Sequence, residues 1–128
     1  MINHWEDFDA GPTQPRGERL HVTLSPRNVI LLNGNMHEQM GKPEAVMLMF
    51  DKVHSLIGLR ATHPDRPGAF PLKNKSGGRH KLVRATPFCK HWGIRVDRPT
   101  AFIDPELTSD GILKLDLRKT FTVGRRKA

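Results

Sequence analysis

Basic side chains gather in one part of the sequence and have the chemistry to neutralise phosphate. Residues 71–98 hold eight lysines and arginines against one acidic residue, Asp97, and the whole chain has a net charge of +8. Each phosphate that is neutralised releases counterions, so this concentration of charge favours a polyanionic partner. The alternative is a solvated basic surface that has no partner.

Histidine and cysteine side chains give little support for metal or nucleophilic chemistry. His37, His54 and His63 are separated by 17 and 9 residues, whereas a structural zinc site uses four ligands with close pairs. Cys89 precedes Lys90 at a helix start, where a thiol pKa is lowered, but a small buried thiol fits the same position. The chain has no tyrosine and no G-x-S-x-G motif. We therefore expect no enzyme, no metal and no cofactor.

The predicted strands and helices that position the basic residues occur in the same order twice along the chain. Strands are predicted at 29–32, 45–50 and 56–61, and again at 80–84, 100–104 and 112–117. A short helix that ends at glycine follows the first strand of each set: Asn33 precedes Gly41 by eight residues, and Ala85 precedes Gly93 by eight. A further strand at 21–24 makes a hairpin with 29–32. This order predicts two copies of one supersecondary unit, each of which buries its apolar face against the other.

The two predicted helices have similar start signals and apolar faces. Asn33 or Asn35 is suited to cap the first helix, and Thr86 to cap the second with Pro87 at its first position. Each helix carries an i, i+4 apolar pair, which is Met36 with Met40 in the first and Phe88 with Trp92 in the second. We expect both pairs in the core, although Phe88 and Trp92 also have the chemistry to stack on bases.

Composition divides the chain into one small domain with peripheral segments. We expect a flexible arm at 1–20, a first unit at 21–63, a Pro/Gly-rich basic linker at 64–78, a second unit at 79–118 and a basic tail at 119–128. No apolar run approaches the roughly 20 residues of a membrane span, and the N-terminus lacks a secretory signal. A single cysteine fits a reducing, cytoplasmic location.

This order of elements resembles the AbrB/MazE/MraZ-like swapped-hairpin DNA-binding family. The resemblance is carried by Val22–Leu24, Arg27–Asn33, Met36, Met40–Gly41, Val46–Asp51 and Ile57–Arg60, with 80–117 as a degenerate second copy. It implies an α+β, β-rich fold in which two hairpin–short helix–hairpin units interlock into one small barrel-like body. It also implies that one face presents basic side chains to DNA, with Arg27, Lys81, Arg84 and Lys90 at matching positions.

The sequence thus predicts a DNA-binding protein, such as a small transcriptional regulator or an antitoxin-like factor, whose partner is double-stranded DNA. The protein would be a monomer with a pseudo-dimeric core or a homodimer. The candidate nucleic-acid-binding residues are Arg27, Lys73, Lys75, Arg79, Lys81, Arg84, Lys90, Arg95, Arg125 and Arg126. Two alternatives stay open: a plasmid- or phage-type interaction or inhibitor module that docks on an acidic protein, and an RNA- or ribosome-associated protein.

Overall fold

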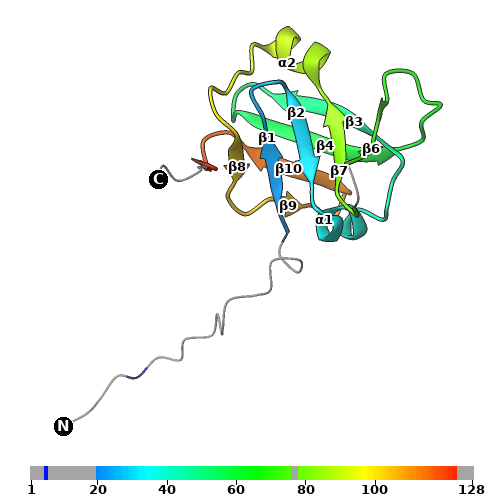
Figure 1. The fold of residues 1–128 in the computed structure, drawn as a ribbon, viewed down its shortest axis with the longest axis horizontal. Helices are drawn as coiled ribbons and strands as arrows, with labels where there is room; N and C mark the ends of the chain where they lie inside the picture. The colour runs from blue at the N-terminus through cyan, green and yellow to red at the C-terminus, as the bar shows by residue number, and fades with distance from the viewer. Residues whose placement is uncertain (1–4, 6–19, 76–77, 124–128) are drawn as a thin grey trace.

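The computed structural model describes residues 5, 20–75 and 78–123, which form two antiparallel β-sheets and two short helices (Figure 1). The first sheet has the strand order β11-β8-β1-β2-β7-β6, formed by Thr120–Thr122, Thr100–Phe102, Val22–Leu24, Val29–Leu32, Lys81–Arg84 and Lys73–Asn74. The second has the order β5-β3-β4-β10-β9, formed by Phe70–Pro71, Ala45–Asp51, Leu56–Thr62, Ile112–Asp116 and Glu106–Leu107. The helices are α1, Gly34–Gln39, and α2, Thr86–Trp92.

The β-rich class predicted from the sequence is confirmed, but the described strands do not close into a barrel. Each sheet ends in two edge strands, β11 and β6 in the first and β5 and β9 in the second. In Figure 1 the first sheet lies in front of the second. In the part of the chain that the structure describes, no helix is long and apolar enough to cross a membrane.

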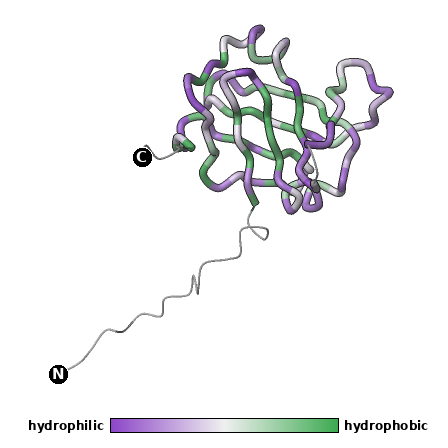
Figure 2. The backbone as a smooth tube through the Cα atoms, viewed as in Figure 1, coloured by the Kyte–Doolittle hydropathy of each residue, from purple (hydrophilic) through white to green (hydrophobic). Residues whose placement is uncertain are grey.

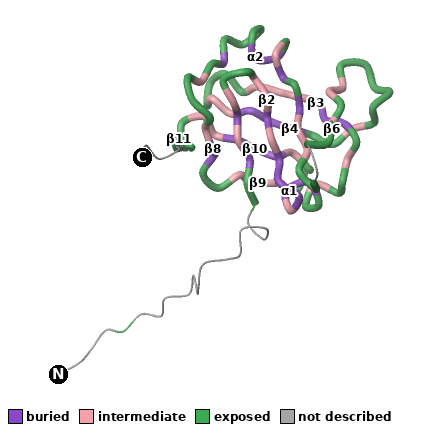
Figure 3. Tube along the Cα trace, in the orientation of Figure 1, coloured by how far each residue is buried: buried purple, intermediate pink, exposed green. Residues whose placement is uncertain are grey.

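One hydrophobic core joins the two sheets and both helices. Alternating residues of the central strands are fully buried, among them Ile30 and Leu32 of β2 and Leu113 and Leu115 of β10. Figure 2 shows hydrophobic residues concentrated along the paired strands, and Figure 3 shows buried positions on the same strands. This alternation places one face of each sheet against the other sheet, as in a packed β-sandwich.

Strands from both halves of the sequence pair with one another in each sheet. In the first sheet β2 runs antiparallel to β7, with Ile30 opposite Val83. In the second sheet β4 runs antiparallel to β10, with Leu59 opposite Leu113. The strand that enters α1 therefore lies against the strand that enters α2. Because the two strands are antiparallel, α1 and α2 lie at opposite ends of the molecule (Figure 1).

The helix ends were predicted well, with one correction. Asn33 caps α1, and its side chain accepts a hydrogen bond from the Met36 amide at 3.0 Å. Gly41 and Gly93 both adopt positive φ angles, of 90° and 69°, which stop the helices as expected. Thr86 does not cap α2: the cap is Ala85, because the Ala85 amide bonds to the Asn28 carbonyl at 2.8 Å and continues the strand pairing to that residue.

Several segments without a strand pattern nevertheless pair with sheet edges. The predicted linker contributes β5 and β6, which pair with β3 and β7, while its residues Phe70 and Leu72 pack against the core. The segment between the predicted strands 100–104 and 112–117 contains β9, and the first part of the expected tail forms β11 against β8. The expected arm, apart from Trp5 and Leu20, and residues 124–128 lie outside the described residues.

Candidate nucleic-acid interface

The turn between β1 and β2 is built so that Arg27 stands at its exposed tip. The Ser25 hydroxyl accepts hydrogen bonds from the amides of Arg27 and Val29, both at 3.2 Å, and the Asn28 amide bonds to the Ser25 carbonyl at 2.9 Å. Asn28 adopts a φ of 65°, a conformation that asparagine tolerates better than most residues. The bond between Asn28 and Ala85 then fixes this turn beside the start of α2.

Further cations surround this turn and define a surface that we call the basic end. Arg84 is paired with Val29 in the register of β2 and β7, which places it at the turn end of the strand pair. Lys90 on α2 and Arg95 line a cavity together with Pro26 and Asn28 of the turn. Arg98 follows three residues after Arg95, on the segment that leads to β8. The basic end consists of Arg27, Arg84, Lys90, Arg95 and Arg98, all of which are exposed.

The cations of the basic end are not neutralised within the described part of the protein. None of the ion pairs found among the described residues involves any of the five. Asp97 is the acidic residue that lines the same cavities. Excess positive charge at this surface attracts anions, and the attraction weakens as salt screens it.

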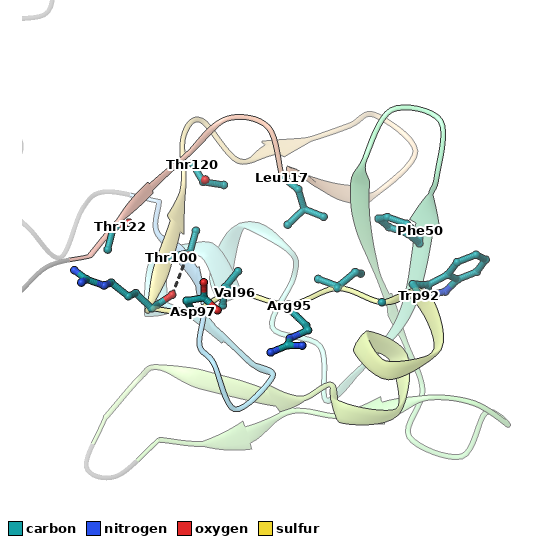
Figure 4. Close-up of a pocket in the computed structure, with 12 residues that line it drawn as sticks. Phe50, Trp92, Arg95, Val96, Asp97, Thr100, Leu117, Thr120 and Thr122 are labelled. Carbon is teal, nitrogen blue, oxygen red and sulfur yellow. Dashed lines mark hydrogen bonds between the residues drawn. The ribbon is translucent and has the colours of Figure 1, made fainter.

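Two cavities share the segment 93–97 in their walls. One has a volume of about 520 Å³ and lies between this segment, Lys90 and the β1–β2 turn. The other has a volume of about 560 Å³ and is bounded by α2, the segment 93–98, and β11 with the residues around it. Figure 4 shows the second cavity, with Phe50 and Trp92 at one side and Thr100 and Thr122 at the other.

Trp92 lies at the edge of the second cavity and not in the core, where the i, i+4 pattern had placed it. Its exposed fraction is 39%, whereas that of Phe88 is 7%. The Trp92 ring lies 5.4 Å from the Phe50 ring and 4.7 Å from the ring of His91. Trp92 is the last residue of α2 and Gly93 is its C-cap, so the last turn extends beyond the core and leaves the indole partly exposed. The apolar pair of α1 is buried to a similarly unequal extent, because Met36 is fully buried and Met40 is half-buried.

The remaining predicted cations do not lie at the basic end. Leu32 pairs with Lys81 at the α1 end of the strand pair, and β6 brings Lys73 and Asn74 beside β7. The placement of Lys81 corrects the expectation that it shares one face with Arg27, Arg84 and Lys90. The reason is that Lys81 and Arg84 are the first and last residues of the extended strand β7, and the register places Arg84 beside Val29 and Lys81 beside Leu32.

Two cations at the α1 end are used within the protein. The Arg79 guanidinium donates hydrogen bonds to Asn35 Oδ1 at 3.1 Å and Glu38 Oε2 at 3.0 Å. The Lys81 ammonium donates to Asn74 Oδ1. Lys75 is exposed, and its amide bonds to the His80 carbonyl at 3.0 Å. Arg125 and Arg126 lie outside the described residues.

The cysteine, histidine and aspartate side chains either have structural roles or are not grouped in a way that would bind a metal ion. Cys89 is 1% exposed, and burial raises the pKa of its thiol, which is the opposite of activation. The histidines, cysteine and carboxylates of the described residues form no group of three or more that could hold a metal ion. Asp51 closes the β3–β4 turn, where its carboxylate accepts bonds from the amides of Val53 and His54, both at 3.1 Å. Asp104 also lies in a tight bend, with a φ of 52°.

The sequence signals for the basic end were incomplete. Arg27, Arg84, Lys90 and Arg95 were predicted site residues, whereas Arg98 was counted only as charge and Trp92 only as a secondary candidate for stacking. No protein-family model matches the chain, and no match was found among curated proteins or among solved structures.

Proposed function

We propose that this protein binds DNA through the basic end and acts as a small regulator. The observation that carries the proposal is the convergence of Arg27, Arg84, Lys90, Arg95 and Arg98, without internal ion pairs among the described residues, around two open cavities. Cations of this kind contact phosphate oxygens and fix the register of a protein on a duplex. Arginines that reach the major groove also distinguish guanine by bidentate hydrogen bonds.

The pairing of strands from both halves supports a duplicated, interlocked architecture behind this surface. The first half supplies β2 and β4, the second supplies β7 and β10, and each sheet contains one pair. Half of the described body is too small to bury a stable core alone. We propose that two swapped-hairpin-like units complete each other in one chain, and that the turn and helix of different units meet at the basic end.

The contacts favour the basic end over the α1 end as the binding surface. At the α1 end, Arg79 is held by Asn35 and Glu38, and Lys81 by Asn74. The Glu38 carboxylate offsets the positive charge of Arg79, and the Asn74 side chain holds the Lys81 ammonium, so both cations attract a phosphate less strongly than an unpaired cation does. At the basic end no described carboxylate competes within ion-pair distance.

A salt titration of duplex binding tests the proposal. The variant combines Arg27→Gln, Arg84→Gln, Lys90→Gln and Arg95→Gln. We expect it to bind a DNA duplex about tenfold or more weakly at about 50 mM salt and to flatten the slope of log K against log [salt] by about 3 to 4. The slope changes because the variant neutralises fewer phosphates, and binding then releases about one counterion fewer for each phosphate contact that is lost.

The matched control removes the same charge elsewhere on the protein. It combines Lys52→Gln, Arg60→Gln, Arg66→Gln and Lys119→Gln, four exposed residues that lie outside the basic end and have no ion-pair partner among the described residues. We expect the control to keep most of the affinity and of the salt slope. Equal losses in the two variants, or no duplex binding by the unmodified protein at low salt, would contradict the proposal.

A further inference from the structure

We infer that the 560 Å³ cavity beside Trp92 binds one unpaired nucleotide of a nucleic-acid strand. The inference rests on the proposed function and specifies the ligand of part of the same surface. The volume of the cavity lies within the range of roughly 300–1,000 Å³ that is typical of small-ligand sites. The chemistry of the lining divides into an aromatic edge, an apolar floor, a row of hydroxyls and a charged rim.

Trp92 supplies a surface on which a base can stack. Its indole is 39% exposed, and the Phe50 ring supports it at 5.4 Å. The His91 ring contacts it edge-on at 4.7 Å and restricts its orientation. Exposed aromatic rings bind bases of any sequence by stacking, and cations beside them hold the strand.

The floor and the far wall fit the two kinds of surface on a nucleoside. Ile94, Val96 and Leu117 give an apolar floor below the position of a base. Thr120 and Thr122 of β11 make no side-chain hydrogen bond to a described residue, so their hydroxyls are available to base or sugar atoms (Figure 4). The Thr100 hydroxyl donates to the Arg98 carbonyl at 2.8 Å, which leaves its oxygen as an acceptor.

The charged residues at the rim can bind the phosphate of the nucleotide. Arg95 and Arg98 are the cationic residues that line the cavity, and Asp97 lies between them in the sequence. The arginines attract the phosphate, while the Asp97 carboxylate can accept hydrogen bonds from an amino group of a base. Within a duplex an internal base is stacked on both faces, so its face becomes available to Trp92 only when the nucleotide is unpaired and leaves the stack.

Fluorescence in a Trp5→Phe background tests the inference, because the chain has two tryptophans and Trp92 is then the only one. The probes are a single-stranded oligodeoxythymidine, a single-stranded oligouridine and a two-stranded blunt-ended DNA duplex that has neither a loop nor an overhang. We expect one or both single strands to quench Trp92 emission at saturation, and the blunt duplex to leave it nearly unchanged. The strand that binds more tightly identifies the source of the nucleotide as DNA or RNA.

Substitution of the indole provides the second readout. We expect Trp92→Leu to weaken single-strand binding by about tenfold, since stacking on an aromatic side chain contributes this much per base. Trp92→Phe should restore most of it, and neither change should alter affinity for the blunt duplex. Phe121→Leu is the matched control, because Phe121 is a 53% exposed aromatic residue that does not line the cavity.

The outcomes separate this inference from the proposed function. If single strands bind without quenching and Trp92→Leu leaves their affinity unchanged, the inference is wrong while duplex binding through the basic end stands. A loss for Trp92→Leu that Phe121→Leu matches would also overturn the inference. If neither single strands nor the duplex bind at low salt, the proposed function fails and the inference fails with it.

Discussion

Gly34 and Arg79 occupy adjoining space at the α1 end of the molecule. A Cβ atom added to Gly34 would lie 2.7 Å from the Arg79 Cβ and 2.9 Å from both its Cζ and its Nε. The absence of a side chain at Gly34 therefore lets Arg79 lie across the first turn of α1. From there the guanidinium donates hydrogen bonds to Asn35 and Glu38. Arg79 therefore links the segment before β7 to α1.

Gly34→Ala is expected to destabilise the protein despite the higher helix propensity of alanine. Alanine in a helix is favoured over glycine by up to about 1 kcal/mol, but overpacking costs about 1–3 kcal/mol. With the full gain in helix propensity, we expect a net loss of up to about 2 kcal/mol in the free energy of unfolding, measured by urea denaturation. Gly78→Ala is the control, because a Cβ there meets its nearest neighbour at an ordinary 3.8 Å.

A double-mutant cycle identifies the cause of this loss. Arg79→Gly removes the three atoms that lie nearest to the new Cβ. Gly34→Ala should then cost less in the Arg79→Gly background than in the unmodified protein, with a coupling of about 1 kcal/mol. Strictly additive effects would show that the close approach of these two residues is not the reason.

Arg79 and Arg95 should differ in their effect on nucleic-acid binding, although both were predicted contacts. Arg95→Gln is expected to weaken duplex binding and to reduce the salt slope by about 0.9. Arg79→Gln should change binding little and lower stability by about 0–1 kcal/mol, as expected for an exposed ion pair. Gel-shift titrations and thermal unfolding of both variants measure the contrast, which disappears if the α1 end is the true contact surface.

Asn33→Ala is expected to destabilise by about 0.5–2 kcal/mol, the range for loss of a helix N-cap. The Asn33 carboxamide oxygen accepts bonds from the Met36 amide at 3.0 Å and from the His21 amide at 3.2 Å, and so it also ties α1 to the residue before β1. Asn33→Asp retains an acceptor at the same place and should retain most of the stability. Equal losses for alanine and aspartate in chemical denaturation would argue against capping.

Cys89 should react slowly with a thiol reagent in the folded protein. Its side chain is 1% exposed, and burial raises its pKa, so both access and the thiolate fraction at neutral pH are low. With 5,5′-dithiobis-(2-nitrobenzoic acid) at pH 7, we expect labelling about tenfold or more slower than in urea-unfolded protein. Rapid stoichiometric labelling of the native protein would instead indicate an accessible, activated thiol.

Asp51 should contribute to acid sensitivity. The hydrogen bond from the His54 side chain, followed by one from the His54 amide, lowers the pKa of Asp51 below its ordinary 3.8. A lowered folded-state pKa means that the stabilisation is fully present above the ordinary value and is lost as the pH falls through the folded-state pKa. Thermal unfolding of Asp51→Asn should therefore depend less on pH below about 4 than that of the unmodified protein. Identical pH profiles would contradict this assignment.

Local sequence determined the elements whose signals lie within a few residues. The Val46–Phe50 run followed by Asp51 predicted the β3–β4 hairpin, since a continuous apolar run and an aspartate turn act over short distances. Asn33, Gly41 and Gly93 located the helix ends for the same reason, because capping and positive φ are properties of one or two residues. The β-rich class followed from the number of such elements.

Tertiary structure alone decided how those elements meet. The short strands β6 and β11 have no periodicity of their own and exist because the edges of β7 and β8 offer backbone partners. The antiparallel register of β2 and β7 placed Arg84 beside the β1–β2 turn and Lys81 beside the residue before α1, neighbours that charge counting along the chain could not reveal. The exposure of Trp92 likewise depends on where α2 ends relative to the core, because helical spacing fixes a face but not what covers it.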